Sequence, residues 1–249
     1  MSDVIRITSR QNPALKRVAS LSGSKGRTAE NAFFTEGFKL FKEACCSGRT
    51  PREVWISDSY RGERPAAGTV YSVPDEVYAK ISEQSAPEGL LCVFDKFEIE
   101  PVKNSCTLLL EEMQDPGNLG TVLRSAAAFG CREVVGVCSC DPFSPKAVRA
   151  SMGAVFKVPY KAFDTLAEAL SYIGDKPLYA AALSDTATEI DKVDLSSACI
   201  MIGNEGHGLS DEALSKSDCQ IIIPIENIES LNASTAASVI LYEAMRCRR

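Results

Sequence analysis

The stretch CIMIGNEGHGLSDEALSKSDCQIIIPI, residues 199–225, indicates the fold class of the chain. It begins with CIMIG and ends with CQIIIPI, two apolar runs typical of buried strands. Between them, a loop with three glycines leads into SDEALSKS, a predicted helix with Ser210 as its N-cap. A strand, a helix and a second strand in this order are typical of a parallel α/β sheet that is buried on both faces.

The same alternation extends over residues 106–249. Further strands are predicted at TLLLEEM (107–113), VVGVC (134–138), VFKVPY (155–160) and LYAAAL (178–183). Further helices are predicted at NLGTVLRSAAAFG (118–130), SPKAVRASMG (144–153), FDTLAEALSYIG (163–174) and NASTAASVILYEAMRCRR (232–249). We therefore expect an α/β domain over residues 106–249, with a mostly parallel sheet.

Residues 1–96 predict a smaller domain of mixed α/β type. FFTEGFKLFKEACCSG (33–48) indicates a short strand followed by an amphipathic helix, and PDEVYAKISEQ (74–84) indicates a helix. Strands are predicted at VWISD, TVYSV and LLCVFD. The polar segment 97–105, which contains Pro101, is expected to link the two domains.

Composition excludes several classes of protein. No apolar run approaches the ~20 residues that span a bilayer, and the first residues lack the apolar core of a signal peptide, so a cytoplasmic location is expected. The ten cysteines include no C-x-x-C pair, and the chain has one histidine, so we expect reduced thiols and no metal site. Residues 1–52 carry a net charge of +6 within a chain of net charge −6, which indicates a basic surface at one end or a chance variation in surface charge.

Three loops follow predicted strands, at the sheet edge where α/β proteins bind ligands. In the second loop, residues 203–208 read G-x-E-G-x-G, which is neither a dinucleotide fingerprint nor a Walker loop. Glu205 would repel a pyrophosphate, so a cationic ligand without phosphate, such as S-adenosylmethionine, fits better. Taken alone, the glycines are also compatible with an ordinary turn before a helix.

The other two loops contain polar residues with equally ordinary alternatives. The first, at 114–130, carries Asn118, Gly120 and Arg124, and such an arginine is commonly part of a surface ion pair. The third, at 221–244, carries Ser230 and Asn232 before a helix, where both residue types are common N-caps.

Together, the three loops resemble the signature motifs of the SpoU (TrmH-like) family of RNA ribose methyltransferases, within the SPOUT superfamily. The motifs are N-x-G-x-x-x-R at 118–124, G-x-E-G-x-G at 203–208 and a Pro-to-Ser-Leu-Asn motif at 224–234. The resemblance covers residues 106–249, and residues 1–96 resemble the family's RNA-binding domain, which has a ribosomal-protein-like fold. The third loop is shorter than usual, with Asn227 near a family glycine; asparagine tolerates the positive φ of such a turn.

The resemblance implies a deep trefoil knot, S-adenosylmethionine as cofactor, no metal, a homodimer, and methyl transfer to a ribose 2′-hydroxyl of rRNA or tRNA. The implied catalytic residues are Arg124, Asn118, Glu205, Ser230 and Asn232. The implied cofactor-binding residues are Leu183, Gly203, Gly208, Ile223, Ile225 and Leu231. The expected RNA-phosphate contacts are Arg10, Lys16, Arg17 and Arg27.

A guanidinium is a poor base, so we expect Arg124 to hold an RNA phosphate and to stabilise the developing alkoxide. Two other functions remain open from the sequence. One is an RNA-binding or ribosome-assembly factor of the same fold without methyl transfer. The other is a nicotinamide-dependent enzyme, which the missing G-x-G-x-x-G after the first strand disfavours.

Overall fold

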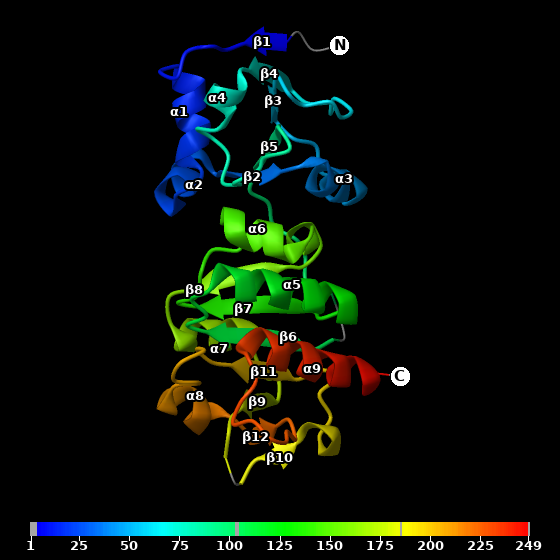
Figure 1. The fold of residues 1–249 in the computed structure, drawn as a ribbon. Coiled ribbons are helices and arrows are strands. Elements are labelled where there is room, and N and C mark those ends of the chain that lie inside the picture. Colours follow the sequence, from blue (N-terminus) through cyan, green and yellow to red (C-terminus); the bar gives the residue numbers. More distant parts are fainter. Residues whose placement is uncertain (1–3, 103–104, 185, 249) are drawn as a thin grey trace. The chain divides into compact units, whose positions relative to one another are not determined.

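The computed structural model describes residues 4–102, 105–184 and 186–248, which form two compact units (Figure 1). The first unit comprises Met1–Phe97 and Phe143–Phe156, and the second comprises Glu98–Pro142 and Lys157–Arg249. The division near residue 97 lies at the expected linker. The inclusion of residues 143–156 in the first unit differs from the expected continuous domain at 106–249.

The first unit contains a five-stranded sheet of order β1-β4-β3-β5-β2. Strands β1, β4 and β3 pair in parallel, whereas β5 is antiparallel to β3 and to β2. The strands are β1 (Val4–Arg6), β2 (Ala32–Glu36), β3 (Glu53–Ser57), β4 (Thr69–Val73) and β5 (Leu90–Asp95). The helices are α1 (Pro13–Ser20), α2 (Ser24–Glu30), α3 (Phe38–Cys46), α4 (Asp75–Tyr78) and α6 (Pro145–Ser151), with a 3₁₀ turn at Ala154–Phe156.

The segment 143–156 belongs to the first unit because its apolar side chains complete the core there. Val148, Val155 and Phe156 are buried in one cluster with Phe33 and Phe94. The sequence prediction of a strand at 155–160 was therefore wrong. Its first residues form the 3₁₀ turn, and a strand begins only at 160, after a proline that has no N–H for a sheet ladder.

The second unit contains a seven-stranded sheet of order β10-β12-β9-β11-β6-β7-β8, in which every neighbouring pair is parallel. This confirms the expected α/β class with a mostly parallel sheet. The strands are β6 (Thr107–Glu111), β7 (Glu133–Val137), β8 (Tyr160–Phe163), β9 (Leu178–Ala181), β10 (Thr188–Glu189), β11 (Cys199–Ile202) and β12 (Cys219–Ile222). The helices are α5 (Pro116–Phe129), α7 (Leu166–Ile173), α8 (Asp211–Lys216) and α9 (Ala233–Arg246), with a 3₁₀ turn at Ile190–Lys192.

Helices cover both faces of this sheet. Leu109, Val135 and Met201 lie in a core cluster with residues of α7 and α8. Alternate residues on the same strands, such as Leu108 and Ile200, are also buried, and they point to the opposite face. There α5 and α9 lie against each other (Figure 1). The result is a three-layer α/β/α arrangement whose sheet interior reads as continuous apolar runs.

Helix caps explain where the elements near the strand ends begin. Ser210 and Asn232 cap α8 and α9 as expected, and Gly130 ends α5 in the left-handed conformation. The N-cap of α5 is Asp115, whose carboxylate accepts a hydrogen bond from the backbone N–H of Asn118. Asn118 is therefore inside the first turn, and its side chain is free for another role. No helix among the described residues is long and apolar enough to cross a bilayer.

Candidate functional site

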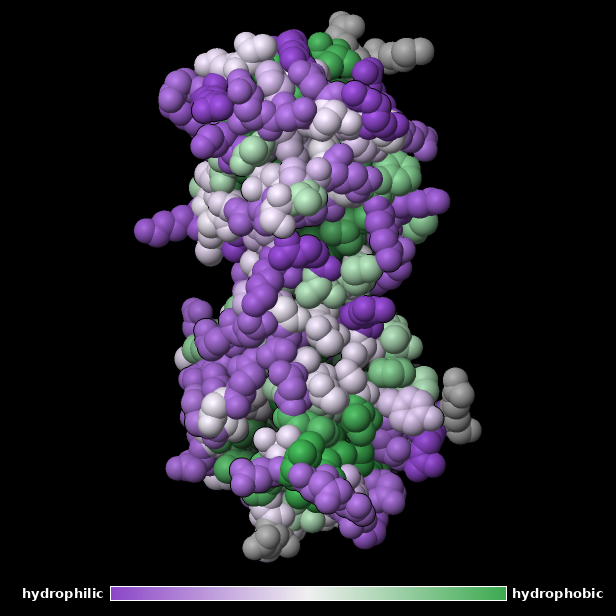
Figure 2. Space-filling view, viewed as in Figure 1, coloured by the Kyte–Doolittle hydropathy of each residue, from purple (hydrophilic) through white to green (hydrophobic). Residues whose placement is uncertain are grey.

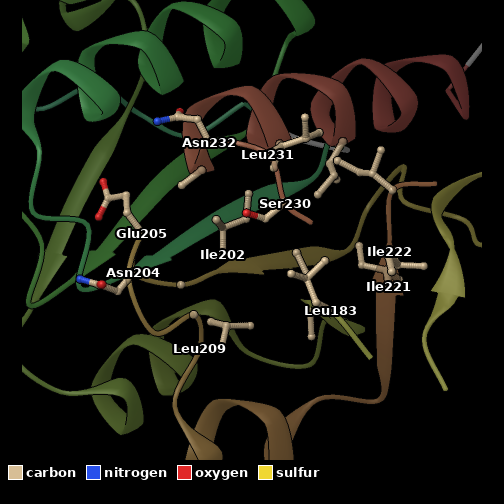
Figure 3. A pocket seen from close by; sticks show the side chains of 18 of the residues that line it. Leu183, Ile202, Asn204, Glu205, Leu209, Ile221, Ile222, Ser230, Leu231 and Asn232 are labelled. Carbon is tan, nitrogen blue, oxygen red and sulfur yellow. The ribbon is translucent and has the colours of Figure 1, made fainter. Parts of the chain in front are cut away.

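A cavity of about 620 Å³ opens at the carboxyl ends of β9, β11 and β12 in the second unit. Figure 2 shows apolar side chains gathered in the lower part of the view, where Figure 1 places the C-terminal elements. The cavity wall is largely aliphatic, with polar groups at one side (Figure 3). Apolar lining residues include Ala181, Leu183, Ile202, Leu209, Ile221, Ile222, Ile223, Ile225, Leu231 and Ile240.

The glycine loop after β11 folds back on itself to form one wall of the cavity. Asn204 and Gly208 exchange both backbone hydrogen bonds, each of 3.0 Å, across this turn. A Cβ on Gly203 would lie 2.1 Å from the carbonyl carbon of Gly208, and Gly208 itself has a φ of +74°. Only glycine at position 203 lets the chain return so closely on itself, and glycine at position 208 adopts the left-handed conformation of the turn without strain.

Glu111 and Glu112, at the end of β6, hold this loop in place. The Glu111 carboxylate, 7% exposed, accepts hydrogen bonds from the backbone N–H and the hydroxyl of Ser210, at 2.8 and 2.7 Å. The side-chain amide of Asn204 donates to the Glu112 carbonyl at 2.9 Å. His207 Nε2 lies 3.3 Å from the Glu112 carboxylate. These contacts hold both ends of the glycine loop against β6.

A chain of side-chain hydrogen bonds joins the three motif loops. Asn118 Nδ2 donates to Glu205 Oε1 at 2.9 Å, and Asn232 Nδ2 donates to Asn118 Oδ1 at 3.3 Å. The other end of the Asn232 amide, Oδ1, accepts from the backbone N–H and the hydroxyl of Ser234. Residues 87 and 114 positions apart in the chain thus form one polar edge beside the cavity.

All six residues expected to bind the cofactor line this cavity, as do three of the five expected catalytic residues. These are Leu183, Gly203, Gly208, Ile223, Ile225 and Leu231, together with Glu205, Ser230 and Asn232. The third loop adopts the turn expected of it, since Asn227 has a φ of +63°. Asn118 reaches the site through Glu205 rather than through the cavity wall.

Arg124 lies elsewhere on α5. Its side chain is exposed and does not line the cavity of its own chain. Within the described ranges its guanidinium has no hydrogen-bond or ion-pair partner. An arginine without a partner on the same helix as Asn118 is available to an external anion.

Cys140 lies near Glu205 of the polar edge. Burial raises the pKa of its thiol to about 11, and the negative charges of Asp115, Glu205 and Asp141 act in the same direction. The thiol therefore stays protonated at neutral pH and is a weak nucleophile. Among the described residues, no group of three or more His, Cys, Asp or Glu side chains is arranged to hold a metal.

In the first unit, the structure corrects part of the expected RNA-binding set. Arg27 is 3% exposed and donates to the Leu21 and Ser22 carbonyls, so its assignment as a phosphate contact was wrong. Arg17 donates to both carboxylate oxygens of Glu53 at 2.7 Å, which commits its charge to the unit itself. Both guanidiniums stabilise the fold here.

The other two residues of the expected RNA-binding set lie on the surface of this unit. Lys16 is exposed, and Arg10 is exposed with a 3.6 Å contact to Glu76. Opposite charges at that distance on the surface contribute little, so an anionic ligand can replace Glu76.

Sequence reasoning missed Asn204 and Glu111, which hold the glycine loop. The signal for Asn204 was its place inside G-x-E-G-x-G. For Glu111 it was an acidic residue at the end of an apolar strand, which normally requires buried hydrogen-bond donors. Their partners, Glu112 and Ser210, lie 92 and 99 positions away, so only the folded chain identifies them.

The lining fits a nucleoside without phosphate. Aliphatic side chains supply faces for an aromatic base, and the folded glycine loop exposes backbone groups at the cavity wall. Among the described residues, no lysine or arginine lines the cavity, so a polyphosphate would find no cationic partner there. S-adenosylmethionine meets these requirements.

Both parts of the chain match known sequences. Residues 105–242 match the SpoU rRNA Methylase family, and residues 12–92 match the MRM3-like substrate binding domain. A Synechocystis protein named as an uncharacterized tRNA/rRNA methyltransferase is 34% identical, over 98% of this chain and 95% of its own. The 23S rRNA (guanosine(2553)-2′-O)-methyltransferase RlmP of Bacillus subtilis is 30% identical, over 95% of this chain and 98% of its own.

Solved structures agree with these matches. The AdoMet-bound rRNA methyltransferase from Sinorhizobium meliloti has a TM-score of 0.83 and 27% identity, and the likeness covers 98% of both chains. A structure of an RNA 2′-O ribose methyltransferase has a TM-score of 0.82 and 29% identity, covering 98% of this chain and 99% of that one. Because the family match spans more than half of the sequence and includes the three loops around the cavity, this chain belongs to the SpoU rRNA Methylase family.

Proposed function

We propose that this protein transfers the methyl group of S-adenosylmethionine to a ribose 2′-hydroxyl of RNA, with ribosomal RNA as the substrate. The observation that carries the proposal is the hydrogen-bonded chain Asn232–Asn118–Glu205 at the mouth of a cavity that fits a phosphate-free nucleoside. Membership of the SpoU family supports the same reaction, and it disfavours the nicotinamide-dependent enzyme considered from the sequence.

In this proposal, the cavity holds the cofactor and the polar edge holds the acceptor. Backbone groups near Gly203 and Leu231 bind the cofactor, which supplies an electrophilic methyl group. Asn118, Glu205 and Asn232 fix one another, and with Ser230 they orient the ribose for in-line attack, because alignment provides much of the acceleration. Arg124 holds an RNA phosphate and stabilises the oxygen as negative charge develops on it.

Ribosomal RNA is favoured by the two relatives that match over nearly the whole chain length. RlmP is named as acting on 23S rRNA, and the other is named for both tRNA and rRNA. RlmP is also named for a guanosine, and we propose guanosine as the acceptor nucleoside. Mapping ribose methylation in RNA from cells with and without the protein would identify the nucleotide. A missing methyl group on a different base would contradict the guanosine assignment.

The first unit is proposed to bind the RNA. Its match to the MRM3-like substrate binding domain and the exposed charges of Arg10 and Lys16 support this role. Phosphate contacts of this kind position the RNA without reading its bases. A cytoplasmic location is part of the same proposal, and cell fractionation would test it.

A homodimer would complete the site. Arg124 is exposed on α5 beside small exposed residues, Thr121, Ala127 and Ala128, which allow a second chain to approach closely. We propose that Arg124 of one protomer serves the cavity of its partner. One chain has a mass of 26.9 kDa, and light scattering should then give twice that mass.

Mixing two inactive variants would test the shared site directly. Arg124→Ala and Gly203→Ala are each expected to be inactive alone, whereas mixed dimers would contain one site with neither change. Recovery of part of the wild-type activity on mixing is the expected result. No recovery in mixed dimers, isolated with two different affinity tags, would contradict a site shared between protomers.

We also propose that the C-terminal helix passes through a loop of the second unit, as the family's knot requires. The contact of α9 with the 3₁₀ turn Ile190–Lys192 and the neighbouring contact of Cys247 with the Val193 carbonyl support this path. An experimental structure in which the 182–198 segment does not encircle the chain near α9 would contradict it.

Substitution of Arg124 separates transfer from cofactor binding. Arg124→Ala should lower the rate of methyl transfer about 10²–10³-fold, the usual effect of removing a preorganised group that stabilises developing charge. Its Kd for S-adenosylmethionine should stay within about threefold of wild type, because the contacts proposed for Arg124 are with the RNA phosphate and the ribose oxygen and not with the cofactor.

Two measurements check this prediction: tritiated-methyl transfer to rRNA, and calorimetry with the cofactor. If wild-type protein binds RNA but neither binds the cofactor nor transfers a methyl group, the alternative of a ribosome-assembly factor would replace the proposed function.

A further inference from the structure

The cavity has an uneven distribution of charge. Of the described residues that line it, Glu205 is the only one with a carboxylate, none is a lysine or arginine, and His207 is the only other ionisable one. His207 is engaged with the Glu112 carboxylate, on the β6 side of the glycine loop. The cavity is therefore lined mainly by aliphatic side chains, with one carboxylate at its polar edge.

The position of this carboxylate is fixed. Asn118 Nδ2 donates to Glu205 Oε1 at 2.9 Å, and Asn232 in turn holds Asn118. Figure 3 shows Glu205 and Asn232 on the same side of the cavity, away from Leu183. Within the described ranges, Oε2 of Glu205 accepts no hydrogen bond. One oxygen anchors the side chain, and the other keeps its charge available to a ligand.

Methyl transfer changes the charge of the ligand in this cavity. As the ribose oxygen bonds to the methyl carbon, the carbon–sulfur bond breaks and its electron pair stays on sulfur, while the proton of the ribose hydroxyl is released to water. The cationic sulfonium thus becomes a neutral thioether, and the remaining atoms are unchanged. A fixed carboxylate near the reacting end attracts the first ligand and not the second. Hydrophobic and backbone contacts, in contrast, are the same for both.

We propose that Glu205 makes the cavity selective for the cationic methyl donor over the neutral S-adenosylhomocysteine that transfer leaves behind. The selectivity limits inhibition by the product. It rests on the proposed function, since it requires the cofactor to occupy this cavity with its sulfonium toward the polar edge.

Calorimetric titration with three ligands would test the proposal. The ligands are S-adenosylmethionine, S-adenosylhomocysteine and sinefungin, in which a protonated amine replaces the methylsulfonium. Glu205→Gln keeps the shape of the side chain and an oxygen to accept from Asn118. It should weaken binding of both cationic ligands about tenfold. Binding of S-adenosylhomocysteine should change less than twofold.

Glu226→Gln is the matched control. Glu226 is an exposed carboxylate in the loop after β12 that does not line the cavity, so its removal changes the net charge equally. All three affinities should stay near wild type. An equal effect of the Glu226 and Glu205 changes would mean that general charge, and not this carboxylate, sets the preference, which would overturn the proposal.

Two other outcomes would also overturn it. Equal weakening of all three ligands by Glu205→Gln would assign Glu205 a structural role only, and unchanged affinities would assign it none. Failure of the proposed function is a separate result, because it appears as absent methyl transfer by wild-type protein, whatever the ratio of the affinities. Circular dichroism of each variant would show that the fold is kept.

Discussion

Gly203 illustrates how a single residue is constrained by a contact that the sequence does not display. The G-x-E-G-x-G pattern indicates that glycines matter in this loop, but it does not distinguish their roles. The structure does. Gly203 lies against the backbone of Gly208, whereas the nearest atom to a Cβ on Gly206 would be the side-chain oxygen of Asn204, at 3.3 Å.

Gly203→Ala should therefore abolish cofactor binding and destabilise the protein. The added methyl would overlap the Gly208 backbone, and overpacking of this kind costs about 1–3 kcal/mol. Calorimetry and denaturant unfolding would measure both effects. Gly206→Ala is the control and should bind within a few-fold of wild type. Similar losses in both variants would mean that loop flexibility, rather than close approach, is what the glycines provide.

At the scale of elements, α5 and α9 bring the first and third motifs together. The two helices touch along their lengths: Ser125 Oγ lies 2.6 Å from Ser238 Oγ, and the rings of Phe129 and Tyr242 meet edge to face at 5.7 Å. Small residues at this contact let the helices approach closely, as the Ala- and Ser-rich sequences indicate. The Asn118–Asn232 contact lies at the amino-terminal end of the same pair.

A double-mutant cycle on Ser125 and Ser238 should show coupling. The hydrogen bond between the hydroxyls is half-buried, so a coupling free energy of about 0.5–1.5 kcal/mol is expected in denaturant unfolding. A second cycle, of Ser125→Ala with Ser215→Ala on the exposed surface of α8, should be additive. Additivity in the first cycle would show that the helices are held by apolar packing alone.

At the scale of the whole molecule, the two units differ in charge and in proposed role. Residues 1–52 have a net charge of +6, although the chain as a whole is acidic. Part of that positive charge is used internally, on Glu53 and on backbone carbonyls. Arg10 and Lys16 are among the groups left for an external anion.

RNA affinity should depend steeply on salt, because phosphate contacts release bound counterions. Replacing Arg10 and Lys16 with glutamine should make the plot of the logarithm of the RNA association constant against the logarithm of salt concentration less steep. The magnitude of its negative slope should fall by about two, one for each cationic side chain removed. Filter binding at several salt concentrations would measure it. Lys192→Gln with Lys216→Gln, on the second unit, removes the same charge and should leave the slope unchanged. A flat salt response in wild type would exclude phosphate binding as the main source of affinity.

Several features followed from the sequence because their causes are local. Apolar runs separated by capped helices predicted the parallel sheet, and Ser210, Asn232 and Gly130 marked helix ends where the structure has them. The motif spacing predicted the family, and the lining of the cavity includes the residues that the family resemblance implied, except Asn118 and Arg124.

What the sequence determined alone is most of the strands and helices of the second unit and the chemical character of the loops, because both depend on neighbouring residues. Only the tertiary structure decided which charged groups are available. It buried Arg27, paired Arg17 with Glu53, left Arg124 without a partner among the described residues, and placed 143–156 in the first unit. The physical reason is that burial, ion pairing and core packing depend on residues distant in the chain, which a linear pattern does not specify.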